Sequence, residues 1–219
     1  MNGNGQPAGQ QGEMAREPRD SALAFTEGVR SGWIASDLQA WVADHLVETR
    51  RLALDPGQPL RVFEPGAGSV TLGEPASSST RGSVRAGAPV TALLTAARER
   101  VLKTLSASVD SGQTSYIHAA LYTGRVSRER GANGRSSWYV FLADDMPLSD
   151  QVLALFAADA LMNPAEYETD LCVCDVCGAV SFQAHSGSRR GCAIHPFGSV
   201  EGGKPPSSRS GARLITDRT

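Results

Sequence analysis

The sequence predicts an α+β domain, in which an antiparallel sheet of four to five strands packs against three helices, followed by a small appendage rich in cysteine and histidine. Two observations lead to this fold class. Some segments repeat an apolar residue every three to four positions, as one face of a helix does, and others alternate apolar and polar residues, as strands do. The resulting order, α-β-β-(β)-α-β-β-α, mixes helices and strands in the manner of an α+β domain.

Composition divides the 219 residues into four segments. Residues 1–32 are rich in Gly, Gln, Asn and Pro and have too few large apolar side chains to offset the entropy lost on ordering, so we expect a flexible arm. The α+β domain is predicted at residues 33–165 and the cysteine-rich appendage at residues 166–197. Residues 198–219 are rich in Gly, Pro, Ser and Arg, which predicts a disordered basic tail.

Three segments carry the helical repeat. The first starts at Ser36, which forms the pattern of a capping box with Gln39. The second follows Pro89, a residue suited to the first position of a helix. Its predicted apolar face consists of Val90, Leu93, Leu94, Ala97, Val101 and Leu105. The third is capped by Ser149 and is apolar almost all round, which indicates a largely buried helix that ends at Asn163.

The strand pattern occurs in four segments, with a short additional one. Residues 60–72 predict a hairpin with its turn at Pro65 to Gly68, and residues 83–87 a short third strand. Residues 116–126 and 137–143 predict two more strands. The last of these is apolar on both faces, which indicates a central strand covered on both sides.

Every cysteine of the chain lies in one short segment. Two pairs of metal-binding residues occur there, each with a two-residue spacer: Cys174 with Cys177, and Cys192 with His195. Thiolate and imidazole are ligands that Zn²⁺ prefers, and the short spacer lets one turn aim both side chains at one ion. We therefore predict a zinc site formed by these four residues. Four protein ligands leave no coordination position for a substrate, which indicates a structural site.

Other chemistries of these cysteines are less well supported. A redox pair of the thioredoxin kind would place its second cysteine at the start of a helix, whereas the residues after Gly178 indicate an extended chain. A disulfide framework needs an oxidising compartment, and the sequence shows no export signal. A zinc deaminase carries a His-x-Glu ahead of its cysteine pair, and none occurs here. Cys172 and His185 are spare donors, expected to be a small buried residue and a solvated turn residue.

Two resemblances follow from these patterns. Residues 172–196 resemble a zinc ribbon, with a donor pair, a short strand, a turn and a second donor pair in succession. The layout of residues 36–162 resembles the type III secretion chaperone-like fold. The likeness is closest at residues 126–156, where a basic turn, a Trp-Tyr-Val-Phe-Leu strand, a Met-Pro-Leu and a helix follow one another. That family dimerises and binds polypeptides without catalysis, so the resemblance implies a homodimer or another protein as partner.

The predicted function is a cytoplasmic protein-binding or adaptor module without enzymatic activity. The sequence contains no P-loop, no Gly-x-Ser-x-Gly elbow and no His-Glu-x-x-His. No apolar run approaches the roughly 18 residues of a membrane span, so we expect no membrane contact. The net charge of −2 predicts no general affinity for nucleic acid. The alternative is a nucleic-acid-binding regulator that uses Arg189, Arg190 and the basic tail, and a third hypothesis is an anion site or enzyme at the loop between Arg125 and Arg135.

Overall fold

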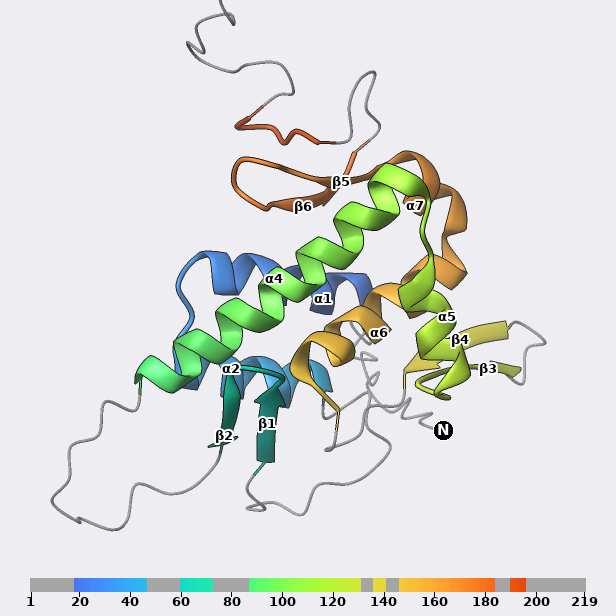
Figure 1. Cartoon of the computed structure of the whole chain (residues 1–219). Helices are drawn as coiled ribbons and strands as arrows, with labels where there is room; N and C mark the ends of the chain where they lie inside the picture. The colour runs from blue at the N-terminus through green and yellow to red at the C-terminus, as the bar shows by residue number, and fades with distance from the viewer. Residues whose placement is uncertain are drawn as a thin grey trace, which may run out of the picture.

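The described part of the chain forms a helical body that carries three short hairpins. The computed structural model describes residues 18–46, 60–72, 87–130, 136–140, 146–183 and 190–195. Within these residues the hairpins lie at separate places around the helices (Figure 1). No helix in these ranges is both long enough and apolar enough to cross a lipid bilayer.

Helix α6 (Leu148–Met162) is the centre of the body. Every residue from Leu148 to Ala160 except Asp150 is buried, as the largely apolar sequence predicts. It packs against α1 (Pro18–Arg30), α4 (Gly87–Ser111) and α5 (Ser115–Tyr122). All six residues of the predicted apolar face of α4 are buried as well.

Helix α6 is capped from a distant strand. Ser149 lies inside the helix, not at its N-cap, which is Pro147. The buried carboxylate of Glu64 accepts hydrogen bonds from the Ser149 backbone N–H and the Ser149 hydroxyl, both at 2.9 Å. The prediction that Ser149 is the cap was therefore wrong, because a carboxylate more than eighty residues away satisfies the helix terminus.

The flexible arm predicted at residues 1–32 is wrong for residues 18–32, and residues 1–17 lie outside the described part. Helix α1 begins at Pro18, and its Ala22 and Phe25 are fully buried. Phe25 meets Trp41 with ring centroids 5.1 Å apart, and Trp33 lies against both rings. Few apolar residues suffice here because the buried ones lie on one face of α1, and that face packs against α6, which is distant in the sequence.

The first predicted helix is present but is capped differently. Helix α2 (Ala35–Trp41) continues into a π-helical turn, η1 (Val42–Leu46). The backbone N–H of Ile34 donates to the Asp37 carboxylate at 2.8 Å, whereas Ser36 lies within the helix. The Asp37 carboxylate, rather than the predicted Ser36 and Gln39 pair, therefore closes this helix end.

The predicted sheet of four to five strands is wrong, although the broad α+β class holds. Strands β1 (Leu60–Glu64) and β2 (Gly68–Leu72) form the predicted hairpin. Strand β4 (Ser136–Val140) pairs with β3 (Val126–Arg130) and, among the described residues, with no other strand, so it is not the predicted central strand. The predicted third strand lies outside the described residues except for Gly87, which begins α4.

The predicted strand at residues 116–126 is mostly helix α5. Its Tyr116 and Ala120 are buried one turn apart, and the helix packs on α6. This packing overrides the β-propensity of its apolar residues, because propensity is weaker than burial against a preformed surface. The sheet on which the chaperone-like resemblance depends is therefore absent from the described ranges.

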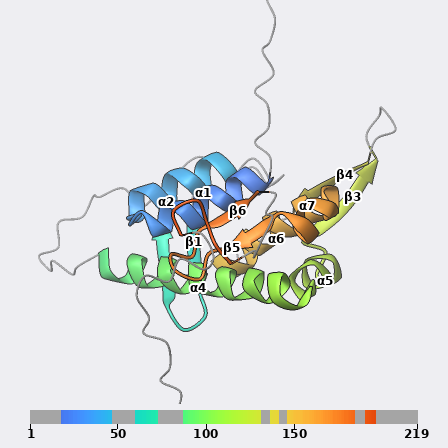
Figure 2. The same ribbon diagram turned by 90° about the horizontal axis from the view of Figure 1, so that it is seen from above.

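The cysteine-rich segment is part of the same body and not an appendage. Strands β5 (Leu171–Val173) and β6 (Val180–Phe182) form a hairpin that follows helix α7 (Pro164–Thr169). Leu171 and Val173 are buried in the main core. The hairpin contacts both α4 and α1 and bridges them, as the view from above shows (Figure 2). Phe182 also packs on Tyr167, with ring centroids 4.8 Å apart.

Candidate metal centre

Two turns carry the four predicted ligands. Cys174 directly follows β5, and Cys177 lies in the turn that connects β5 to β6. Backbone hydrogen bonds close this first turn: Gly178 N–H donates to the Cys174 carbonyl at 2.8 Å, and Cys174 N–H donates to the Ala179 carbonyl at 2.9 Å. In the second turn, Cys192 N–H donates to the His195 carbonyl at 2.9 Å. Each two-residue spacer therefore forms a tight turn, and we call these turns the first and second knuckles.

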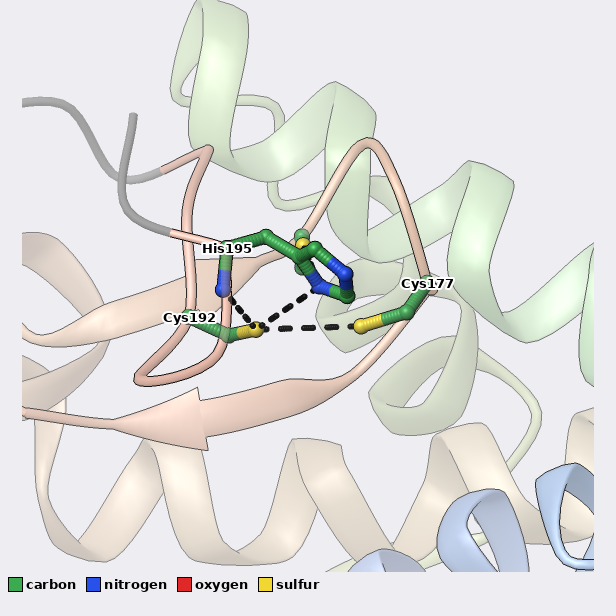
Figure 3. A group of neighbouring side chains, drawn as sticks. Cys177, Cys192 and His195 are labelled. Atoms are coloured by element: carbon green, nitrogen blue, oxygen red, sulfur yellow. Dashed lines mark hydrogen bonds between the residues drawn. The ribbon is translucent and has the colours of Figure 1, made fainter. Parts of the chain in front are cut away.

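The two knuckles bring all four side chains together. Their donor atoms lie within 4.8 Å of one another, a group that could hold a metal ion. Cys177 Sγ lies 3.7 Å from Cys192 Sγ, and Cys192 Sγ lies 3.5 Å from His195 Nδ1. Dashed lines join these atoms in Figure 3. Cys174 Sγ lies 3.9 Å from the same nitrogen. Four ligands around a tetrahedral ion at 2.0–2.3 Å would be separated by about 3.8 Å for two sulfurs and about 3.6 Å for sulfur and nitrogen.

The thiols differ in burial and in their ease of ionisation. Cys174 is 2% exposed, whereas Cys177 and Cys192 are half-buried. Burial raises the pKa of Cys177. Burial also acts to raise the pKa of Cys192, but hydrogen bonds from the backbone and side chain of His195 and from the backbone of Ile194 outweigh it and lower that pKa to about 6. Cys192 is therefore the thiol of this pair that ionises more readily.

Arg190 ties the two knuckles to each other and to the body. Its guanidinium lies 3.0 Å from the Asp175 carboxylate of the first knuckle and 2.5 Å from the Asp110 carboxylate at the end of α4. The Asp175 N–H also donates to the Arg190 carbonyl at 3.2 Å. Arg190 is one of the arginines that the nucleic-acid hypothesis uses, and in the structure it pairs with the carboxylates of Asp110 and Asp175. Arg189 and the basic tail lie outside the described residues.

The spare donors do not join the cluster within the described ranges. Cys172 is fully buried on β5, opposite Ser181, as expected of a small core residue. It is not among the four residues that converge. His185 lies outside the described residues.

The predicted arginine loop is only partly described. Arg128 and Arg130 lie on strand β3 rather than in the turn, and Arg135 is outside the described residues. Arg125 lines a pocket of about 300 Å³ together with Arg100 and Asp150. The Arg100 guanidinium lies 3.2 Å from the Asp150 carboxylate, so it forms an ion pair within the chain.

Arg98 is a residue of this site that sequence reasoning missed. It projects from α4, and its guanidinium donates to the carbonyls of Cys177 and Gly178 in the first knuckle. In the sequence, Arg98 is marked only by its position next to Ala97, a residue of the predicted apolar face. That signal does not identify a partner some eighty residues further along the chain.

Comparison with known proteins gives no relative. No protein-family model matches the chain, and neither the curated proteins nor the solved structures yield a match. The zinc-ribbon and chaperone-like resemblances therefore rest on the sequence patterns alone. What can be said of function comes from the four converging residues and their surroundings.

Proposed function

We propose that the chain binds one Zn²⁺ through Cys174, Cys177, Cys192 and His195, and that this ion is structural. The observation that carries the proposal is the convergence of three sulfurs and one imidazole nitrogen within 4.8 Å, with the nearest pairs at the separations of a tetrahedral site. Thiolate and imidazole together favour zinc over the hard cations magnesium and calcium, which take oxygen ligands.

The same proposal assigns the chain a non-enzymatic, protein-binding role in the cytoplasm. A closed set of four protein ligands offers no position for substrate, and reduced thiols suit a reducing compartment. Each knuckle also exposes the aliphatic residue that precedes its last ligand: Val176 is 72% exposed and Ile194 is 73% exposed. These two side chains support a contact surface at the metal centre for another protein or a second copy of the chain.

Metal analysis of the purified chain tests the zinc site. We expect one zinc per chain in the wild type, and loss of zinc in Cys177→Ser. Cys172→Ala is the matched control, because this cysteine lies two residues before the first ligand but outside the cluster, and the variant should keep its zinc. A zinc-free wild type whose β5–β6 hairpin resists proteolysis as well as the zinc-loaded form would disprove the proposal.

The binding role is tested by removing the exposed aliphatic surface without touching a ligand. The double variant Val176→Ser/Ile194→Ser should keep one zinc and the stability of the wild type. In sedimentation velocity and in pull-downs scored by mass spectrometry, it should lose the dimer or the partners that the wild type retains. A monomeric wild type whose retained proteins are the same as those of the double variant contradicts the protein-binding role.

A further inference from the structure

One arginine joins the metal centre to the two helices beneath it. Arg98 is half-buried on α4, and its Nε donates to the Thr26 carbonyl of α1 at 3.0 Å. Its Nη2 donates to the carbonyls of Gly178 at 2.8 Å and Cys177 at 3.2 Å. A single planar guanidinium therefore holds α1, α4 and the first knuckle in one arrangement, with its donors in a fixed fork.

The first knuckle lies so close to Arg98 that a side chain at position 178 would clash with it. Gly178 has a φ of +64°, in the left-handed region. A Cβ at this position would lie 2.8 Å from Arg98 Nη2 and 2.8 Å from Leu102 Cδ1. The peptide that follows the Cys177 ligand is thus seated directly on α4, so the position of the guanidinium fixes the position of that peptide.

The charge of Arg98 also suits the centre. Three thiolates and a neutral imidazole around a divalent ion carry one net negative charge, which a nearby guanidinium offsets. Arg98 and Arg30 both interact electrostatically with Cys177. Arg30 is exposed and already pairs with Glu27, whereas Arg98 donates directly to the ligand-bearing peptide.

We propose that Arg98 is a positioning residue for the metal centre, and that it couples metal binding to the docking of α1 on α4. The inference rests on the proposed zinc site. Because a coupling free energy is reciprocal, metal binding must favour the docking of α1 on α4 by as much as that docking favours metal binding.

Three variants separate this role from a general effect on stability. Arg98→Gln removes the charge and the fork, and should lower zinc affinity 10- to 100-fold, the usual effect of removing a group that supports a metal ligand. Arg98→Lys keeps the charge but not the fork, and should fall between that variant and the wild type. Arg100→Gln is the control, because Arg100 is on the same helix but pairs with Glu64 and Asp150, away from the knuckle. Competition with a chromophoric chelator measures the zinc affinity of each.

Hydrogen exchange supplies a second readout. The amides of residues 26–30 should exchange faster in Arg98→Gln and in the chelator-treated wild type, but not in Arg100→Gln. A folded Arg98→Gln that keeps wild-type zinc affinity overturns the inference while leaving the zinc site standing. If Arg98→Gln does not fold, equal zinc affinities of Arg98→Lys and the wild type overturn it. A wild type that binds no zinc overturns both proposals.

Discussion

Gly178 is the residue on which two separate constraints meet. Its backbone lies in the left-handed region, which costs any residue with a Cβ about 1–2 kcal/mol. Its Cα also faces the ends of Arg98 and Leu102. Arg98 cannot swing away freely, since three backbone carbonyls hold its guanidinium.

Replacing Gly178 by Ala should therefore cost more than the backbone conformation alone. Gly124→Ala is the matched control, because Gly124 has a φ of +68° and open space around the added methyl group. We expect Gly124→Ala to lower the free energy of unfolding by about 1–2 kcal/mol, and Gly178→Ala to lower it further and to weaken zinc binding. Urea unfolding of the zinc-loaded proteins measures both. Equal losses in the two variants would show that the contact with Arg98 contributes nothing.

The sequence identified the four converging side chains because their signal is local. Each donor pair sits on one turn, so the spacing of two residues carries the geometry within itself. Arg98 and Arg190 gave no such signal. Their partners, Gly178 and Asp110, lie 80 residues away along the chain, and only the packing of the hairpin on α4 brings them together.

At the scale of the elements, hairpins replace the expected sheet. Alternation predicted β1 and β2 correctly, because an apolar residue every second position and a glycine turn leave few other structures. The pattern of residues 116–126 was compatible with both strand and helix, since short apolar runs satisfy either period. Burial of Tyr116 and Ala120 against α6 decided in favour of the helix.

The β1–β2 hairpin has a second role as the cap of α6. Glu64→Gln should lower the free energy of unfolding by about 1–2 kcal/mol, because the variant loses the charge that favours a helix N-terminus and weakens two hydrogen bonds. Glu99→Gln, at an exposed position of α4, is the control and should have little effect. Thermal and urea unfolding compare the two. If both variants lower the free energy of unfolding equally, the contacts of Glu64 with the N-terminus of α6 contribute no stability.

At the scale of the whole molecule, the hairpin that carries the candidate metal centre is anchored in the common core. The appendage was predicted from the local spacing of the donor pairs, and that spacing does not reveal how the segment packs on the rest of the chain. Leu171 and Val173 are buried in the main core, and Arg98 and Arg190 tie the knuckles to α4. The metal centre and the helical body should therefore unfold together.

Chelation should accordingly destabilise parts of the chain far from the metal. Two of the three tryptophans, Trp33 and Trp41, pack with Phe25 at the junction of α1 and α2, so most of the tryptophan fluorescence reports on that region. A ligand at a thousand times its dissociation constant stabilises the folded state by about 4 kcal/mol. We expect the tryptophan transition and zinc release to coincide on heating, and both to shift down with chelator. If chelator leaves the tryptophan transition unchanged, the cysteine-rich segment unfolds independently of the helical body, and this prediction is wrong.

The placement of Arg19 has a consequence for how the chain is made. Arg19, in the first turn of α1, contacts Asp159 on α6, Glu166 on α7 and the ring of Phe182 on β6, and Glu166 is 147 residues further along the chain. Closing a loop of that length costs about 4 kcal/mol of chain entropy, so such contacts form late and slow the search for the native state. On the ribosome, α1 emerges well before any of these partners. The part of its apolar face that packs on α6 remains exposed until α6 is made, and it is open to chaperones or to aggregation throughout that interval.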